Sequence, residues 1–283
     1  MKSWLAGALT ALAVAVLVAV YVLWDNTPRG HDGLDATLWM QTAVEHDMAT
    51  TQAFALAKVM LDRALADGGW TAALEQSGDA SALPPAVIFD MDETLVDNSP
   101  FAAKGILDND RRFNHDKWVA WVKRKQATAL PGAIAFARYA TQHDVAIFYI
   151  TNRDHRQASA TLANLKALGF PVAADGANLL SRNKQPGWGS DKATRRAFVA
   201  RTHRILLLFG DDLNDFMSGV RGKGVTMTTR KVLAARHRDN WGTRWIVLPN
   251  PAYGSWQRAT YGFQKSLTDR QIRQQKHQVL KAY

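Results

Sequence analysis

The sequence predicts an α/β fold in which a central parallel sheet is flanked by helices, with one N-terminal transmembrane helix before it. Two observations indicate the α/β core: short apolar runs alternate with segments of helical periodicity, and polar or acidic residues directly follow the strongest runs. A third observation, a long uncharged apolar segment close to the N-terminus, indicates the transmembrane helix.

The N-terminal apolar segment extends from Trp4 to Trp24 and follows a single charged residue, Lys2. A run of about 20 such residues matches the hydrocarbon thickness of a bilayer. No clear A-x-A cleavage site follows, so we expect an uncleaved signal-anchor, with a cleaved signal peptide or a buried helix as alternatives. Lys2 favours a cytoplasmic N-terminus and an outward-facing remainder. Residues 1–26 are therefore assigned to a membrane anchor or signal segment.

The next segments connect this anchor to the predicted sheet. Residues 25–35 are polar and contain helix-breaking Gly and Pro, which predicts a linker. From Leu38 to Leu65, apolar residues recur at spacings of three and four, which predicts helix. Gly68 and Gly69 end this helical pattern, and Leu83-Pro84-Pro85 predicts a second connection just before the first strand.

Five apolar runs predict the strands. The strongest runs are 86–89, 145–150 and 205–209, and the weaker ones are 224–227 and 245–248. The predicted helices between them are 116–125, 132–141, 156–168 and 192–201. Strands that alternate with helices indicate a parallel sheet, and uninterrupted runs such as I-L-L-L-F suit strands buried on both faces.

The residues that follow the strongest runs carry the chemistry. D-M-D-E-T (90–94) follows the first run, T-N-R (151–153) the second, and G-D-D-L-N-D (210–215) the third, while Lys192 opens the helix before the third run. Open α/β sheets bind ligands at the carboxyl ends of their strands. We therefore expect up to five carboxylates, one lysine and one hydroxyl to meet at one edge of the sheet.

Such a group suits metal-assisted phosphoryl transfer. Packed carboxylates repel one another, so a cation must neutralise them or one must hold its proton. An all-oxygen set without Cys or His suits a hard ion, and Mg²⁺ combines few carboxylates with waters and phosphate. Asp90 could attack phosphorus and form an aspartyl-phosphate, and Asp92 could protonate the leaving oxygen. Each motif alone has a structural explanation as a turn or helix cap, but their order and spacing together favour catalysis.

The amino-acid composition further narrows the class of protein and the kinds of partner. Hydrophobic residues make up 47% of the chain and charged residues 21%, which indicates a folded domain with a sizeable core. The net charge of +10 favours anionic partners, and part of it lies in a basic C-terminal tail, residues 265–283, which we expect to form a solvated helix. The sequence contains no Cys, which excludes disulfides, thiolate chemistry and a cysteine-linked lipid anchor.

At this point the sequence resembles the haloacid dehalogenase-like (HAD) superfamily of phosphohydrolases. D-M-D-E-T, Thr151, Lys192 and G-D-D-L-N-D match its four motifs in order. The flanking text F-D-M-D-E-T-L-V-D-N-S-P and L-P-N-P-A-Y-G-S-W is similar to the lipoprotein e family of class C acid phosphatases and 5′-nucleotidases. The resemblance implies a phosphatase domain over residues 27–264, with a small helical cap built from the N-terminal helices and residues 98–130.

The resemblance also implies roles for individual residues. Asp90 would be the nucleophile and Asp92 the general acid, and Thr151 and Lys192 would hold the phosphoryl oxygens. The implied metal site for Mg²⁺ comprises the Asp90 carboxylate, the Asp92 backbone carbonyl, Asp211 and Asp215. The implied substrate-binding residues are Asn152, Arg153, Tyr253 and Phe101, with Trp118 as a further candidate beside the nucleobase.

The expected function is thus a magnesium-dependent acid phosphatase of the bacterial periplasm that hydrolyses 5′-nucleotides. The expected partners are a nucleoside monophosphate, the membrane and a second copy in a homodimer, with no nucleic acid. The alternatives are a phosphatase for another anionic phosphomonoester and an inactive membrane-anchored scaffold. One departure from the family pattern is Asp212, where asparagine is frequent, and its extra charge could shift the pH optimum or the metal preference.

Overall fold

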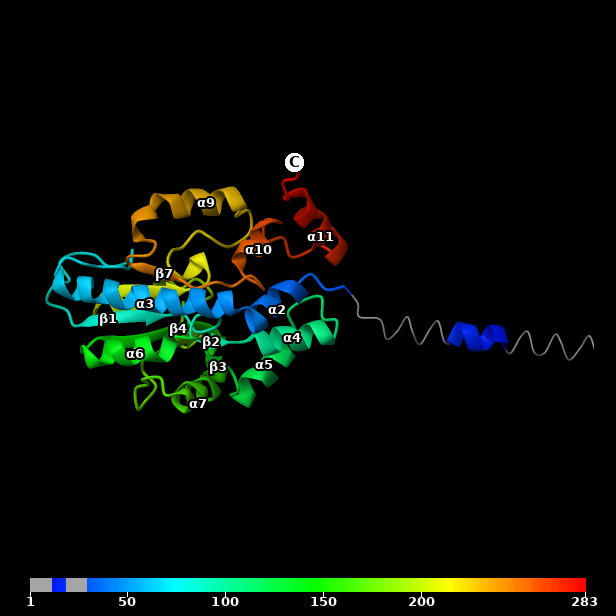
Figure 1. The fold of residues 1–283 in the computed structure, drawn as a ribbon. Helices are drawn as coiled ribbons and strands as arrows, with labels where there is room; N and C mark the ends of the chain where they lie inside the picture. The colour runs from blue at the N-terminus through cyan, green and yellow to red at the C-terminus, as the bar shows by residue number, and fades with distance from the viewer. Residues whose placement is uncertain (1–11, 19–29) are drawn as a thin grey trace, which may run out of the picture.

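The computed structural model describes residues 12–18 and 30–283. Figure 1 shows an α/β body with a central sheet. The predicted transmembrane segment, Trp4–Trp24, lies mostly outside the described residues. Within the described ranges, no helix is both long enough and apolar enough to cross a membrane.

The sheet has five parallel strands in the order β5-β4-β1-β6-β7. Their bounds are β1 Pro85–Phe89, β4 Ala146–Asp154, β5 Leu179–Arg182, β6 Arg204–Gly210 and β7 Trp245–Val247. Val87 in the central strand pairs with Ile147 on one side and with Leu207 on the other. Because β1 has a neighbour on both sides, the residue that follows it emerges at the middle of the sheet edge.

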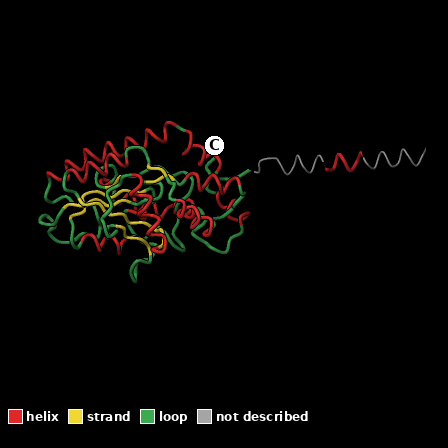
Figure 2. Tube along the Cα trace, turned by 90° about the horizontal axis from the view of Figure 1, so that it is seen from below, coloured by secondary structure: helices red, strands yellow, loops and turns green. Residues whose placement is uncertain are grey.

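Helices cover both faces of this sheet (Figure 2). One face packs against α3 (Val44–Ala66), α6 (Ala133–Gln142) and α7 (Ala158–Leu168). The other face packs against α8 (Ala193–Ala200) and α9 (Met227–Arg236). The short 3-10 turns η1 His155–Gln157, η2 Leu213–Asp215 and η3 Arg238–Asn240 lie between these elements. The predicted α/β architecture with a central parallel sheet is therefore confirmed.

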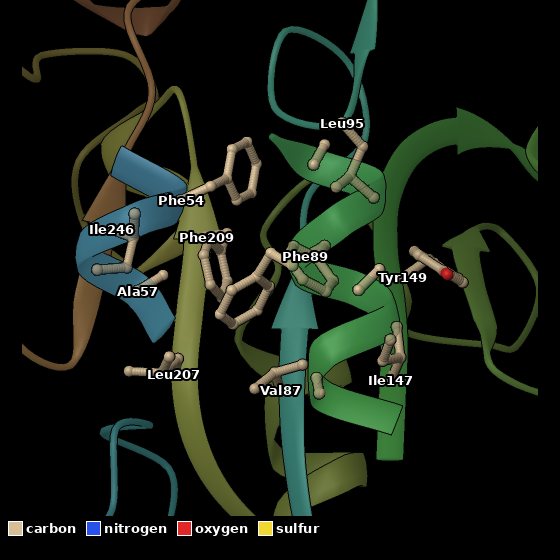
Figure 3. Packing of buried hydrophobic residues seen from close by; sticks show 14 of the residues in the cluster. Phe54, Ala57, Val87, Phe89, Leu95, Ile147, Tyr149, Leu207, Phe209 and Ile246 are labelled. Atoms are coloured by element: carbon tan, nitrogen blue, oxygen red, sulfur yellow. The ribbon is translucent and has the colours of Figure 1, made fainter. Parts of the chain in front are cut away.

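The alternation of side chains along β1 explains the two-sided core. Val87 and Phe89 belong to the cluster under α3 and α6, whereas Ala86 and Ile88 belong to the cluster on the opposite face. In Figure 3, Phe89 lies against Phe209 of β6, and their ring centroids are 4.4 Å apart. Because helices pack on both faces of this parallel sheet, every side chain of a central strand must be apolar.

A group of smaller elements lies at one end of the sheet (Figure 1). It contains α2 (Leu34–Thr42), α4 (Ser99–Leu107) and α5 (His115–Arg124), with the short strands β2 (Val96–Asp97) and β3 (Thr128–Ala129) at its base. α2 and the elements within residues 98–130 lie here, as expected for the cap, but the long N-terminal helix α3, which was also expected in the cap, packs on a face of the sheet instead. Two C-terminal helices, α10 (Ser255–Ala259) and α11 (Asp269–Gln278), lie close to it.

The predicted strand at residues 224–227 is wrong. Gly222 and Gly224 have positive φ angles, and Thr226 forms a capping box that starts α9 at Met227. The fifth strand is instead β5, whose four residues give too short a signal to stand out in the sequence. The helical pattern between Leu38 and Leu65 is also divided, because Ala43 is extended between α2 and α3.

Candidate active site

The carboxyl ends of the strands open into a cleft of about 1080 Å³. Small-molecule sites typically measure ~300–1,000 Å³, so this one is at the upper end of that range. The cleft is lined by nine of the predicted site residues, namely Asp90, Asp92, Phe101, Asn152, Arg153, Lys192, Asp211, Asp215 and Tyr253. Thr151, the remaining predicted residue, is fully buried at the end of the same edge. The predicted meeting of carboxylates, one lysine and one hydroxyl at one sheet edge is therefore found for Asp90, Asp211, Asp215, Lys192 and Thr151.

Three carboxylates form a compact cluster at the base of the cleft. Asp90 follows β1, Asp211 follows β6, and Asp215 ends the η2 turn. Each of them offers one oxygen atom, and these oxygens lie within 4.8 Å of one another. Gly210 makes this possible, because a Cβ at that position would overlap the Asp215 carboxyl group.

Lys192 lies within this cluster and pairs with two of its members. Its Nζ is 2.6 Å from Asp215 Oδ1 and also contacts Asp90 Oδ1. Lys192 is only 3% exposed, so both ion pairs are desolvated. Burial would lower the pKa of this ammonium, but Asp215 and Asp90 outweigh burial, so the pKa is raised and the group stays charged.

The carboxylates themselves hold protons more tightly than usual. Burial raises the pKa of Asp90 to about 7, against the opposing effect of the Lys192 ammonium. Burial, together with Asp215 and Asp90, raises the pKa of Asp211 well above its usual range. Burial also raises the pKa of Asp215. One ammonium therefore does not compensate the cluster, and an additional cation would stabilise its ionised form.

The donor set fits a hard divalent cation. All three groups offer carboxylate oxygens, and no sulfur or imidazole ligand accompanies them in the cluster. The carboxylate of Asp92 is bound by Arg153 and Asn98 and is not a member of this cluster. Asp90, Asp211 and Asp215 are thus the residues whose side chains would hold the ion.

Asp92 is bound by one side chain from β4 and by one from the start of α4 in the cap. The Arg153 guanidinium donates to Asp92 Oδ1 over 2.7 Å, and Asn98 Nδ2 donates to the same oxygen over 3.0 Å. Arg153 also lies over the Trp118 ring, 5.4 Å from its centroid. Arg153 was predicted to bind substrate, and the structure additionally makes it the main partner of Asp92. Asn98 in turn accepts a hydrogen bond from Trp121, so the orientation of Asp92 depends on the cap.

Arg195 is a site residue that sequence reasoning missed. Its side chain is completely buried and donates to the backbone oxygens of Thr151 and Gly189 and to Asn152 Oδ1. It therefore connects the end of β4 to the loop that leads into Lys192. The Thr151 hydroxyl accepts the Arg153 N–H, which leaves its own proton free to donate. The only signal in the sequence was an arginine three residues after Lys192, in an otherwise ordinary amphipathic helix.

The loop that carries Tyr253 is attached to the acidic motif. Asn250 Nδ2 donates to Asp211 Oδ2 over 2.7 Å, and Ser255 N donates to Asp212 Oδ2 over 2.6 Å. Burial would raise the pKa of Asp212, but hydrogen bonds from Ser255 and Asn214 outweigh it and lower that pKa. The extra charge at position 212 is thus used to fix this loop, and Asp212 is not part of the three-carboxylate cluster.

Aromatic rings line the outer part of the cleft. Phe101 lies edge-on to Trp118 with a centroid separation of 5.1 Å, and Phe113 completes this group from the cap. Tyr253 stands on the C-terminal loop and is 40% exposed. The cleft therefore offers flat apolar faces above a charged base.

Comparisons with known proteins agree with this geometry. The family described as "HAD superfamily, subfamily IIIB (Acid phosphatase)" matches residues 24–256. The class C acid phosphatase from Bacillus anthracis has 32% sequence identity and a TM-score of 0.76, over 89% of this chain and 97% of that one. Its structure with tungstate bound matches equally well.

Two curated plant proteins are more distant relatives. The stem 28 kDa and stem 31 kDa glycoproteins of Glycine max are each 26% identical, over 174 and 147 residues. These matches cover 59% and 49% of this chain, and 58% and 48% of the relatives. The chain thus spans about half the length of the curated relatives that it matches.

The chain belongs to the acid phosphatases of subfamily IIIB in the HAD superfamily. Within this family of phosphomonoester hydrolases, its structure is similar to that of the class C acid phosphatase of Bacillus anthracis. The resemblance read from the four motifs is therefore confirmed. Phosphatases of this superfamily generally use a divalent metal, and three acidic residues here could hold one.

Proposed function

We propose that this protein is a magnesium-dependent acid phosphatase that hydrolyses phosphomonoesters through an aspartyl-phosphate on Asp90. The observation that carries the proposal is the position of Asp90 at the base of the cleft. It lies between the Lys192 ammonium and two further carboxylates that could share a cation with it. With such a cation bound, the ion and the Lys192 ammonium would together supply positive charge where a phosphoryl group would arrive.

The residues of the chain then divide the reaction between them. An Asp90 oxygen attacks phosphorus, the bond from phosphorus to the ester oxygen breaks, and Asp92 gives its proton to the departing oxygen. Asp92 afterwards takes a proton from water, whose oxygen attacks the aspartyl-phosphate and releases inorganic phosphate. Lys192 and the Thr151 hydroxyl would hold the phosphoryl oxygens. Mg²⁺, held by Asp90, Asp211 and Asp215 with the Asp92 carbonyl, would supply neutralising charge.

Arg153 and Asn152 support this assignment from the end of β4. Arg153 keeps the Asp92 carboxyl at the cleft. Asn152 lines the cleft beside it and is itself fixed by Arg195. The bound tungstate in the similar Bacillus anthracis enzyme is also relevant, because tungstate is a tetrahedral oxyanion like phosphate.

The proposed substrates are 5′-nucleotides. Tyr253 of the C-terminal loop and Phe101 with Trp118 of the cap all line the cleft, and they could stack against a nucleobase. Membrane attachment through residues 1–26, a periplasmic location and a homodimer remain proposals that rest on the sequence. The domain boundaries at residues 26 and 264 are likewise proposed from the sequence.

The test is phosphate release from adenosine 5′-monophosphate by the purified full-length protein. The assay compares added Mg²⁺, a chelator, the Asp90→Asn variant and the exposed control Asp116→Asn. We expect release that needs Mg²⁺, is lost in Asp90→Asn and is retained in the control. Release that persists in Asp90→Asn would exclude the covalent mechanism. Hydrolysis of aryl phosphates without any nucleotide hydrolysis would refute the nucleotide preference alone, and no hydrolysis of either would favour an inactive scaffold.

A further inference from the structure

The lining of the cleft carries positive charge that the proposed reaction does not use. Five basic side chains line it without a carboxylate partner among the described residues. We call these five the basic rim: Arg111, Arg221, Arg258, Lys265 and Arg270. They come from the cap, from the loop after η2 and from the C-terminal segment, so separate parts of the chain direct the same charge to one opening.

Other cations at this opening have carboxylate partners, which sets the basic rim apart. Arg112 is 2.7 Å from Asp269, and Arg273 and Lys276 are 2.5 Å and 3.7 Å from Asp32. These pairs hold α11 against the cap and the N-terminal segment. The unpaired charge of the basic rim therefore remains available to a ligand inside the cleft.

Three members of the basic rim are held in place by groups that do not cancel their charge. Arg221 Nη1 donates to Ser190 O over 3.2 Å, and Arg111 Nη1 donates to Gly30 O over 3.0 Å. The Arg258 guanidinium lies 5.2 Å from the centroid of the Phe263 ring. Each of these guanidinium groups keeps further N–H donors for an anion.

The base of the cleft and its opening thus carry charge of opposite sign. Its base holds the three carboxylates with Lys192, which would receive the phosphoryl group together with the metal. A neutral nucleoside as leaving group would bring nothing to balance five cations at the opening. A leaving group that carries its own phosphate would balance them and reduce their mutual repulsion.

We propose that the basic rim binds a second phosphate of the substrate, so that the preferred substrates are small bisphosphates such as nucleoside 3′,5′-bisphosphates. This inference rests on the proposed function, because it concerns the leaving group of the same reaction. The ion pairs between α11, the cap and Asp32 enclose one side of the opening, which favours a small ligand over a polynucleotide.

The experiment compares two substrates with the full-length protein at low ionic strength. Release of the 5′-phosphate from adenosine 3′,5′-bisphosphate and from adenosine 5′-monophosphate is followed by chromatography of the products. The rim variant is Lys265→Gln with Arg270→Gln. The matched control, Lys231→Gln with Arg238→Gln, removes the same charge from exposed positions outside the cleft.

We expect the unmodified protein to show the higher kcat/KM for the bisphosphate. The rim variant should lower that value by about three- to tenfold, the size that two exposed charge pairs typically produce. The monophosphate should lose less, the control should match the unmodified protein, and added salt should reduce the difference between substrates.

Three outcomes would overturn the inference while leaving the proposed function intact. One is equal kcat/KM for both substrates in the unmodified protein. Another is an equal loss on both substrates in the rim variant, which would indicate general attraction of anions. A third is a higher kcat/KM for a 5′-phosphorylated oligonucleotide than for the bisphosphate. If neither small substrate is hydrolysed but an aryl phosphate is, the nucleotide preference fails together with the inference; if no phosphomonoester is hydrolysed, the proposed function fails as well.

Discussion

Replacing Asp212 by asparagine tests whether this carboxylate fixes the loop that carries Tyr253. Asp212 Oδ2 accepts the Ser255 N–H, and its Oδ1 accepts the Asn214 N–H. An amide has only one oxygen, so whichever way it turns, its NH₂ group faces one of these backbone donors. Both donors belong to buried residues, and one of them is left without an acceptor.

The cost can be worked out from these contacts. A buried N–H that loses its acceptor destabilises a protein by about 1–3 kcal/mol. Arg230, whose guanidinium lies 4.0 Å from Asp212, loses its carboxylate neighbour but keeps its bond to Val220 O. We take about 2 kcal/mol as the total, which for a protein of this size lowers the Tm by roughly 4–8 °C.

Thermal unfolding and steady-state kinetics of Asp212→Asn would measure both consequences, with Asp116→Asn as the exposed control. Besides the lower Tm, we expect a higher KM for a 5′-nucleotide, because Tyr253 is less firmly placed. The KM for an aryl phosphate, whose leaving group is smaller, should change less. A variant with unchanged Tm and unchanged nucleotide KM would refute the assignment of Asp212 as the residue that holds this loop.

Three further predictions concern residues around the site. Arg195→Met should lower kcat by at least about tenfold, and added guanidinium but not methylammonium should restore part of it, since a planar donor is needed; equal rescue by both would contradict this. Gly210→Ala should displace the Asp215 carboxyl and weaken Mg²⁺ binding measured by calorimetry, and unchanged affinity would be evidence against the close packing. A hydrogen bond from Arg156 lowers the pKa of Asp154 in the folded protein. The ionised Asp154 carboxylate therefore stabilises the fold above its unfolded pKa of ~3.9, and this stabilisation is lost as the pH falls through the lower folded-state pKa. Denaturant unfolding should therefore show Asp154→Asn as clearly less destabilising near pH 2 than at pH 7, and a constant difference would oppose this.

Much of the site was predictable because its residues lie at the ends of strongly apolar strands. The runs that became β1, β4 and β6 are uninterrupted, and a parallel sheet brings their carboxyl ends to one edge. Asp90, Asp211 and Asp215 therefore lie together as expected, and Lys192 reaches them from the start of α8. The cap residues Phe101 and Trp118 could be placed only roughly.

The rest depends on contacts between residues that are distant in sequence. The bond from Asn250 to Asp211 and the ion pair between Arg153 and Asp92 have no local pattern, because each joins different elements. The strand expected at 224–227 failed for a local reason, since a Thr226 cap with two preceding glycines starts a helix. The charged tail was correctly expected to be a solvated helix, but its position at the cleft follows only from the fold.

The ion pair between Arg273 and Asp32 joins residues that are 241 positions apart. One wall of the cleft is thus made from the two ends of the folded region, whereas the sheet is complete by Val247. During synthesis the catalytic edge can form before this wall exists, because this long-range contact must wait until α11 has been made. A nascent or truncated protein that ends before α11 would hence present its reactive edge with an open, less selective entrance.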